Sequence, residues 1–202
     1  MARIVFATGN KGKLKEIRSI MADLNMEIVS MKEAGVDPEI VEDGKTFKEN
    51  AFIKAREVAK LLKDDIVMAD DSGLVIDALN GEPGIYSARY LGEDTPYSVK
   101  NADLIKRLEG VENKDRTARF VCVVACVFPD KTEAFGEGVI EGRIGYEERG
   151  ENGFGYDPIF YLPDKDVTTA ELSEEDKNAI SHRGNALRAV KDHVLRWSRE
   201  NS

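Results

Sequence analysis

A run of small, polar and basic residues, Thr8-Gly9-Asn10-Lys11-Gly12-Lys13, lies between a short apolar segment and a pattern typical of a helix. At such a junction the free backbone N–H groups and the positive end of the helix dipole attract phosphate. Gly9 lets the backbone approach a ligand closely, and the lysines add positive charge. The spacing is not that of a Walker A loop. Taken alone, the run is as typical of an ordinary turn with solvated lysines as of a phosphate-binding loop.

Two adjacent carboxylates open the segment Asp70-Asp71-Ser72-Gly73, which follows the apolar residues 66–69. We expect a brief strand that ends there, where ligands gather in open α/β sheets. Because neighbouring strand residues point to opposite faces, Asp70 and Asp71 should do different jobs. One carboxylate can bind a hard cation such as Mg²⁺, it or its neighbour can orient a water, and Ser72 can bond a phosphate oxygen. The alternative is a plain Asp-Ser-Gly turn.

Two further segments could bind a base. In Phe154-Gly155-Tyr156-Asp157-Pro158 an aromatic ring can stack on a purine, and Asp157 can accept a hydrogen bond from a base N–H. Ser181-His182-Arg183, with Lys177 a few residues earlier, makes a positive cluster in an acidic chain. The alternatives are aromatic packing for the first segment and a solvated face for the second.

The elements around these motifs predict an α/β fold with a mixed sheet flanked by helices. Strands are expected at 4–7, 27–31 and 66–69, with a hairpin formed by 117–128 and 132–142. Helices are expected at 11–24, from a capping box at Thr46 onward, from Thr95-Pro96 to about 108, and from 173 to the C-terminus.

Composition excludes several classes of protein. The formal net charge of -9 argues against a general nucleic-acid binder, which usually presents a basic face. No apolar run approaches membrane-helix length, and a strand pattern starts at the N-terminus, so we expect no membrane partner, no secretory segment and a cytoplasmic location. Cys122 and Cys126 on one strand would lie about 13 Å apart, beyond the reach of a disulfide. We expect them to be small core residues.

Six segments in order give the chain a resemblance to the inosine-triphosphate pyrophosphatase family. They are Thr8-Gly9-Asn10 with Lys13 and Glu16; Thr46-Phe47 with Glu49-Asn50-Ala51; Asp70 to Leu74; Pro83 to Tyr90; Phe154 to Phe160; and Ser181 to Gly184. The resemblance implies one domain over residues 1–202, with an elongated α/β fold of two lobes and a cleft between them. It also implies a homodimer.

The resemblance implies hydrolysis between the α and β phosphates of ITP, dITP and XTP, giving a nucleoside monophosphate and pyrophosphate. Asp71 would bind Mg²⁺, with Mn²⁺ as a substitute, and act as general base. Glu42 fits best as a second metal ligand, and Glu39 is the second choice. The residues that would bind substrate are Thr8, Gly9, Asn10, Lys11, Gly12, Lys13, Lys54, Ser72, Phe154, Gly155, Tyr156, Asp157, Lys177, His182 and Arg183.

Hydrogen bonding supports such a substrate class, because deaminated purines carry a keto oxygen at C6 where adenine has an amino group. Donors placed there would be left unpaired by ATP. His182, Arg183 and backbone N–H groups are the candidate donors. Two other functions stay open: a pyrimidine triphosphate pyrophosphatase of the septum-formation-inhibitor type, and a nucleotide sensor that has lost catalysis.

Overall fold

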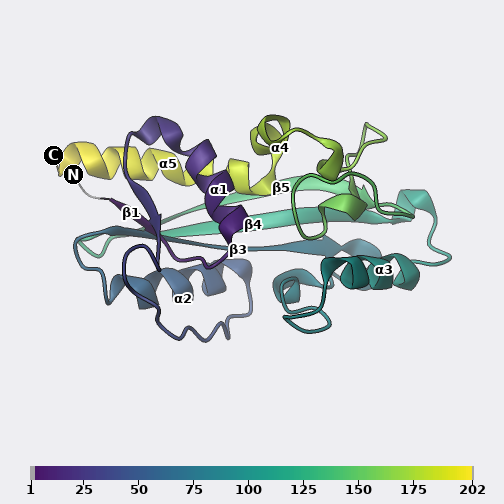
Figure 1. The fold of residues 1–202 in the computed structure, drawn as a ribbon, viewed down its shortest axis with the longest axis horizontal. Helices are drawn as coiled ribbons and strands as arrows, with labels where there is room; N and C mark the ends of the chain where they lie inside the picture. Colours follow the sequence, from purple (N-terminus) through teal and green to yellow (C-terminus); the bar gives the residue numbers. More distant parts are fainter. Residues whose placement is uncertain (1–2, 202) are drawn as a thin grey trace. The chain divides into compact units, whose positions relative to one another are not determined.

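A computed structural model describes residues 3–201, in which strands and helices alternate along much of the chain (Figure 1). The strands are β1 (Ile4–Phe6), β2 (Ile28–Ser30), β3 (Ile66–Ile76), β4 (Thr117–Val127), β5 (Glu133–Ile144) and β6 (Phe160–Tyr161). The helices are α1 (Lys11–Ile20), α2 (Phe47–Ala59), α3 (Tyr97–Arg107), α4 (Glu174–Ile180) and α5 (His182–Glu200). Short 3-10 turns lie between several of these elements.

The strands form a mixed sheet in the order β2-β1-β3-β4-β5-β6. β1 pairs in parallel with β2 and with β3, whereas β6 pairs antiparallel with β5. β4 and β5 are neighbours joined by a turn in which Phe128 N donates to Thr132 O at 3.0 Å. A connection this short links only antiparallel strands. The mixed α/β sheet and its hairpin are therefore confirmed.

The chain divides into two compact units. Unit 1 contains the residues up to Asp71, Cys122–Gly138 and the residues from His182 onward. Unit 2 contains Ser72–Val121 and Val139–Ser181. β3, β4 and β5 each contribute residues to both units.

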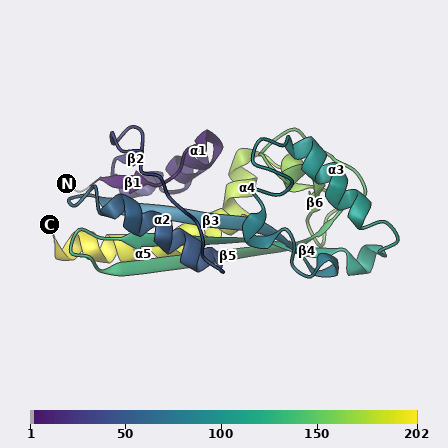
Figure 2. The ribbon, with the colours of Figure 1, turned by 90° about the horizontal axis from the view of Figure 1, so that it is seen from below.

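In unit 1, helices cover both faces of the strands (Figures 1 and 2). Ile66 and Met68 of β3 belong to the core beneath α1 and α5, whereas Val67 and Ala69 belong to the core beneath α2. This alternation is the two-residue period of a strand whose faces are both buried. Continued for two residues, it places Asp70 on the α1 and α5 face and Asp71 on the α2 face.

The strand that carries these aspartates is longer than expected. We expected it to end at Ala69, but β3 continues through Asp70, Asp71, Ser72 and Gly73 to Ile76. Asp70 and Asp71 are both buried. They are therefore not in a turn but in the middle of a strand, where every buried carboxylate needs a partner.

Unit 2 has its own apolar core, in which α3 packs against the parts of β3 and β4 that belong to this unit. Leu104 and Leu108, from α3 and its C-terminal end, pack there with Ile76 of β3 and Phe160 of β6. Arg116 is buried beside this core and donates to the backbone carbonyls of Leu108, Ile144 and Gly145 at 2.6–2.8 Å. The guanidinium thus ties the end of α3 to β5.

The start of α3 lies one residue later than expected. Thr95 is not its N-cap, because the Thr95 hydroxyl donates to Leu91 O at 2.6 Å. Pro96 occupies the N-cap position and the helix begins at Tyr97.

The two cysteines, Cys122 and Cys126, are buried and free, as expected.

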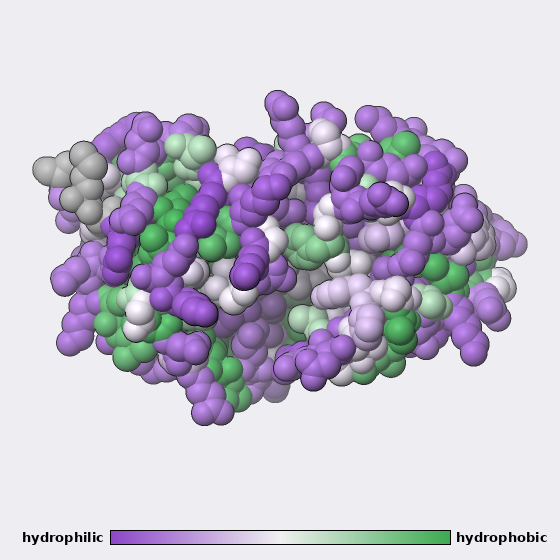
Figure 3. Space-filling model, in the orientation of Figure 1, coloured by the Kyte–Doolittle hydropathy of each residue, from purple (hydrophilic) through white to green (hydrophobic). Residues whose placement is uncertain are grey.

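The visible face in Figure 3 is mostly hydrophilic, with apolar side chains in small separate patches. This agrees with a chain in which 33% of the residues are charged. Within residues 3–201 no helix is both long enough and apolar enough to cross a membrane.

α2 carries Asn50 and Lys54, one helical turn apart on the same side of the helix. It begins after Thr46, whose hydroxyl accepts a hydrogen bond from Glu49 N at 3.1 Å. The Glu49 carboxylate reaches back to Lys45 N at 2.7 Å rather than to the N-cap residue itself. The Thr46 half of the expected capping box is therefore confirmed, whereas the bond that Glu49 should make with the N-cap residue is made with Lys45 instead.

Replacing Thr46 with alanine should lower the free energy of unfolding by about 1 kcal/mol, because the cap acceptor is lost. Thr46→Ser keeps the acceptor and should stay close to the wild type. Urea denaturation followed by circular dichroism measures both. A Thr46→Ala variant as stable as wild type would show that the cap contributes nothing.

Candidate active site

The predicted phosphate loop begins where β1 leaves the sheet. Ala7 N donates to Met68 O at 2.7 Å, so the loop starts beside the strand that carries the aspartates. Asn10 is the N-cap of α1, and its side-chain oxygen accepts from Gly12 N at 2.9 Å and from Lys13 N at 3.1 Å. These two amides are thus already bonded to Asn10. The features of this loop that attract an anion are therefore the helix dipole and the lysine side chains.

A cavity of about 530 Å³ lies beside this loop in unit 1. It is lined by Thr8, Gly9, Asn10, Lys11, Leu14, Lys15, Arg18, Ser30, Lys32 and Glu33. Four of these side chains are basic and one is acidic, in a chain whose net charge is -9. This local excess of positive charge suits an anionic ligand.

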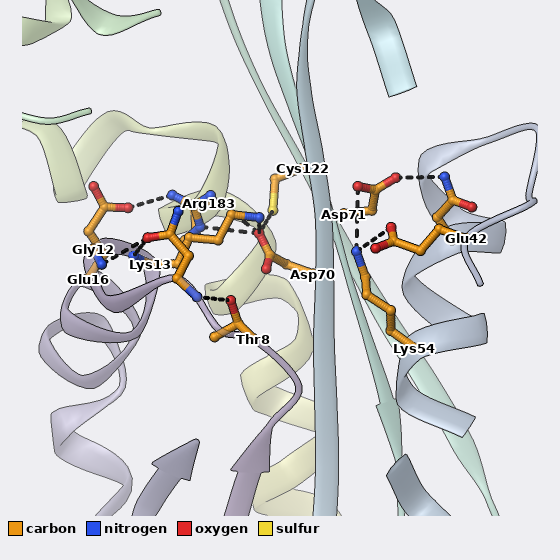
Figure 4. Close-up of polar contacts among 12 residues, drawn as sticks. Thr8, Gly12, Lys13, Glu16, Glu42, Lys54, Asp70, Asp71, Cys122 and Arg183 are labelled. Atoms are coloured by element: carbon orange, nitrogen blue, oxygen red, sulfur yellow. Dashed lines mark hydrogen bonds and ion pairs between the residues drawn. The ribbon is translucent and has the colours of Figure 1, made fainter. Parts of the chain in front are cut away.

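Asp70 lies at the centre of a buried network on the α1 and α5 face (Figure 4). Its Oδ2 is 3.0 Å from Lys13 Nζ and 3.3 Å from Arg183 Nη2. Arg183 Nη1 is in turn 2.5 Å from Glu16 Oε2. The Arg183 side chain is only 2% exposed, so its charge is balanced by these two carboxylates rather than by solvent. The network holds Lys13 of the phosphate loop against β3.

Asp71 lies on the opposite face of β3, beside α2 (Figure 4). Asn50 Nδ2 donates to Asp71 Oδ2 at 3.1 Å, and Asn50 Oδ1 accepts from Gly44 N at 2.9 Å. Lys54 Nζ lies 3.7 Å from Asp71 Oδ1 and 2.7 Å from Glu42 Oε2. Asn50 and Lys54 therefore connect the catalytic candidate Asp71 to the loop that contains Glu42.

The pKa values of the two aspartates are shifted in opposite directions. Burial alone would raise the pKa of Asp70, but the charges of Lys13, Arg183 and Lys54 outweigh burial and hold it well below its ordinary value. Burial raises the pKa of Asp71, and the nearby Lys54 only partly offsets this effect. Asp70 is therefore a fixed structural anion. Asp71 binds a proton more readily than an ordinary aspartate, as a proton acceptor requires.

The Glu42 and Asp71 carboxylates suit a hard cation. Lys54 Nζ already lies within 4 Å of both, so this position attracts positive charge. Among residues 3–201 no cluster of three or more His, Cys, Asp or Glu side chains has the arrangement of a metal site. Mg²⁺ in nucleotide enzymes is commonly held by one or two carboxylates together with substrate phosphates. Two carboxylates therefore fit this ion. Glu39 is exposed, whereas Glu42 is half-buried against Lys54.

The second predicted group, the base-binding segment, lies in unit 2. Asp157 Oδ2 accepts from Phe154 N at 2.9 Å and from Lys177 Nζ at 2.7 Å. The Lys177 ammonium is 4.8 Å from the centre of the Phe154 ring. Tyr156 is buried and donates through its hydroxyl to Ser87 O at 2.7 Å. Phe154, Asp157 and Lys177 are thus brought together, as expected.

The remaining predicted residues are placed as follows. Ser72 is half-buried in β3. His182 is buried at the first position of α5. Arg183 was expected to read a base, but here its guanidinium is bound to Glu16 and Asp70. Base contact by Arg183 would require it to leave those carboxylates.

Asn50 and Glu16 are functional candidates to which residue patterns assigned no role. Both are buried polar side chains on helices that otherwise bury apolar residues: Asn50 on α2 and Glu16 on α1. A polar residue on the buried side of an amphipathic helix is the signal that singles them out, because such groups must be hydrogen-bonded. That signal does not identify the partner.

Comparison with known proteins gives a consistent assignment. Residues 4–193 match the Ham1 family. A dITP/XTP pyrophosphatase from Clostridium perfringens is 47% identical over 199 residues, covering 96% of this chain and 98% of that protein. The structure of a HAM1 protein from Coxiella burnetii superimposes with a TM-score of 0.87 at 43% identity, covering 97% of this chain and 100% of that one. The Staphylococcus aureus Ham1 protein gives a TM-score of 0.84, also at 43% identity, with 96% and 98% covered. This chain belongs to the Ham1 family.

Proposed function

We propose that this protein is a nucleoside-triphosphate pyrophosphatase that hydrolyses ITP, dITP and XTP and so removes deaminated purines from the nucleotide pool. The observation that carries the proposal is its similarity, over nearly its whole length, to a dITP/XTP pyrophosphatase. The local features agree with this activity: a basic cavity at a phosphate-type loop, and a buried carboxylate whose pKa is raised.

In the proposed reaction, Asp71 accepts a proton from the attacking water. The water oxygen bonds to the α phosphorus as the bond from that phosphorus to the oxygen that bridges the α and β phosphates breaks, and pyrophosphate leaves with the bridging oxygen and the electron pair of that bond. Asn50 holds one carboxylate oxygen of Asp71 in place by a hydrogen bond of 3.1 Å. Residues Thr8 to Lys13 bind the triphosphate, with Lys54 close to the phosphates. Burial makes Asp71 a better base than a solvated aspartate.

The same proposal includes a Mg²⁺ ion, with Mn²⁺ as a substitute, held by Glu42 and Asp71. When bound, the ion would neutralise phosphate charge and stabilise the charge that develops on the leaving pyrophosphate. The attraction of this position for the Lys54 ammonium supports the choice of these two carboxylates.

Replacing Glu42 with glutamine should raise the Mg²⁺ concentration needed for half-maximal activity by about tenfold or more, because even outer-shell changes cost that much metal affinity. Glu39→Gln, in the same loop, is the matched control and should leave the Mg²⁺ requirement unchanged. Initial rates over a Mg²⁺ series measure both variants. A shift confined to Glu39→Gln would transfer the metal role to Glu39.

For base recognition, we propose that Phe154 stacks on the purine and that Gly155, Tyr156, Asp157, Lys177 and His182 surround or read it, with Ser72 binding phosphate. Arg183 joins them only if it exchanges its carboxylate partners for the base. Donors facing the C6 position would discriminate against ATP, which carries an amino group there.

A nucleotide panel tests the substrate class. Rates with dITP, ITP and XTP should exceed those with ATP, dTTP and UTP by orders of magnitude. Faster turnover of dTTP and UTP would favour the pyrimidine pyrophosphatase alternative. Tight binding of dITP without any turnover, with Mg²⁺ or Mn²⁺ present, would instead favour the sensor.

We also propose a homodimer in the cytoplasm, in keeping with the resemblance to inosine-triphosphate pyrophosphatases. Light scattering after gel filtration should then give twice the chain mass of 22.5 kDa. A monomeric mass would exclude the dimer.

A further inference from the structure

Asp157 in unit 2 receives hydrogen bonds from three different segments of the chain. Its Oδ2 accepts from Phe154 N and from Lys177 Nζ, as described above. Its Oδ1 accepts from the hydroxyl of Thr169 at 2.8 Å. Asp157 and Thr169 are both nearly inaccessible to solvent, at 3% exposure each. The Thr169 bond therefore fixes a carboxylate that in turn holds the backbone of Phe154.

The loop that carries Phe154 depends closely on the position of this carboxylate. Gly153 and Gly155, which flank Phe154, have φ values of +74° and +70°, which residues other than glycine rarely adopt. A Cβ on Gly153 would lie 2.3 Å from Asp157 Oδ2, so the backbone is pressed directly against the carboxylate. If the carboxylate rotates, Phe154 N loses its acceptor and the loop loses the surface against which it packs.

Thr169 itself is held firmly by its own segment. It starts a short 3-10 turn, Thr169–Glu171, which is closed by a capping box between Thr168 and Glu171. Asn152 N donates to Ala170 O at 2.9 Å, which ties this turn to the loop just before Phe154. A hydroxyl on a fixed backbone can set the orientation of the side chain that it donates to.

We propose that Thr169 is a positioning residue for purine binding: through Asp157, its hydroxyl holds the Phe154 ring in the orientation that stacks on the base. This inference depends on the proposed function, in which Phe154 contacts the purine. The proposed function gives Thr169 no part in binding phosphate or in proton transfer, so its effect should fall on substrate binding and not on the chemical step.

Replacing Thr169 with valine, which keeps the shape and removes the hydroxyl, should raise KM for dITP about tenfold and leave kcat within about twofold. Thr169→Ser retains the hydroxyl and should restore the wild-type KM. Thr117→Val is the matched control, because the Thr117 hydroxyl donates to Asp77 at 2.7 Å in the same unit but outside the base-binding loop. Thr169→Ala is measured in the same way if the valine variant does not fold.

An unchanged KM in Thr169→Val would overturn the inference. So would a Thr169→Ser variant as impaired as the valine one, or a fall in kcat with no change in KM. The proposed function fails differently: wild-type protein would then turn over none of the deaminated purine triphosphates, whatever residue stands at position 169.

Discussion

Replacing Asp71 with asparagine should lower kcat for dITP by about two to four orders of magnitude, the range typical for loss of a general base. Asparagine has nearly the same shape as aspartate. Its side-chain oxygen can still accept the hydrogen bond that Asn50 Nδ2 donates to Asp71 Oδ2 at 3.1 Å in the wild-type protein. It cannot accept the proton of the attacking water. It is also a poorer ligand for a divalent cation, so both proposed roles of Asp71 are lost together.

The fold should survive this change. Because burial raises the pKa of Asp71, the charged form costs more in the folded protein than in water, and a neutral side chain removes that cost. We therefore expect the free energy of unfolding to stay within about 1 kcal/mol of wild type. Steady-state rates and thermal unfolding on the same preparation measure both effects. A rate unaffected by Asp71→Asn would remove this residue from the mechanism.

Replacing the neighbouring Asp70 with asparagine should instead destabilise the protein by about 3 kcal/mol, the cost of removing one partner from a buried ion pair. Lys13 and Arg183 both lose their contact with this carboxylate, and Arg183 retains Glu16. For a chain of this size the midpoint of thermal unfolding should fall by about 6–12 °C.

Asp65→Asn is the matched control for Asp70→Asn. Asp65 pairs with Arg3 at 2.8 Å, but Arg3 is 36% exposed, so solvent screens the pair. Its loss should leave the unfolding midpoint nearly unchanged. Equal midpoints for the two variants would show that the Asp70 network does not stabilise the fold.

The placement of Asp70 and Asp71 on opposite faces of β3 could be predicted from sequence, because side chains on a strand alternate between faces whatever the surrounding fold. The length of β3 could not. Aspartate and glycine are depleted in strands, so Asp70 to Gly73 was expected to end it. Tertiary partners reverse that preference: Lys13 and Arg183 neutralise one carboxylate, and Asn50 bonds the other.

The roles of Asn50 and Glu16 could not be predicted from sequence for a related reason. Asn50 bonds a side chain 21 positions away, and Glu16 bonds one 167 positions away. Local pattern marks such residues as polar groups on a buried helix face but carries no information about distant partners. For Arg183, the sequence suggested base recognition because the residue is basic and follows a histidine, but it could not indicate that the fold pairs the guanidinium with two carboxylates.

The cleavage of a deaminated purine triphosphate between its α and β phosphates is tested most directly by measuring the pyrophosphate and orthophosphate released per dITP consumed, with Mg²⁺ present and no other phosphatase in the assay. We predict one pyrophosphate and one dIMP per dITP, with no orthophosphate as first product. Release of orthophosphate and dIDP as the first products would show that the protein cleaves the bond between the β and γ phosphates instead.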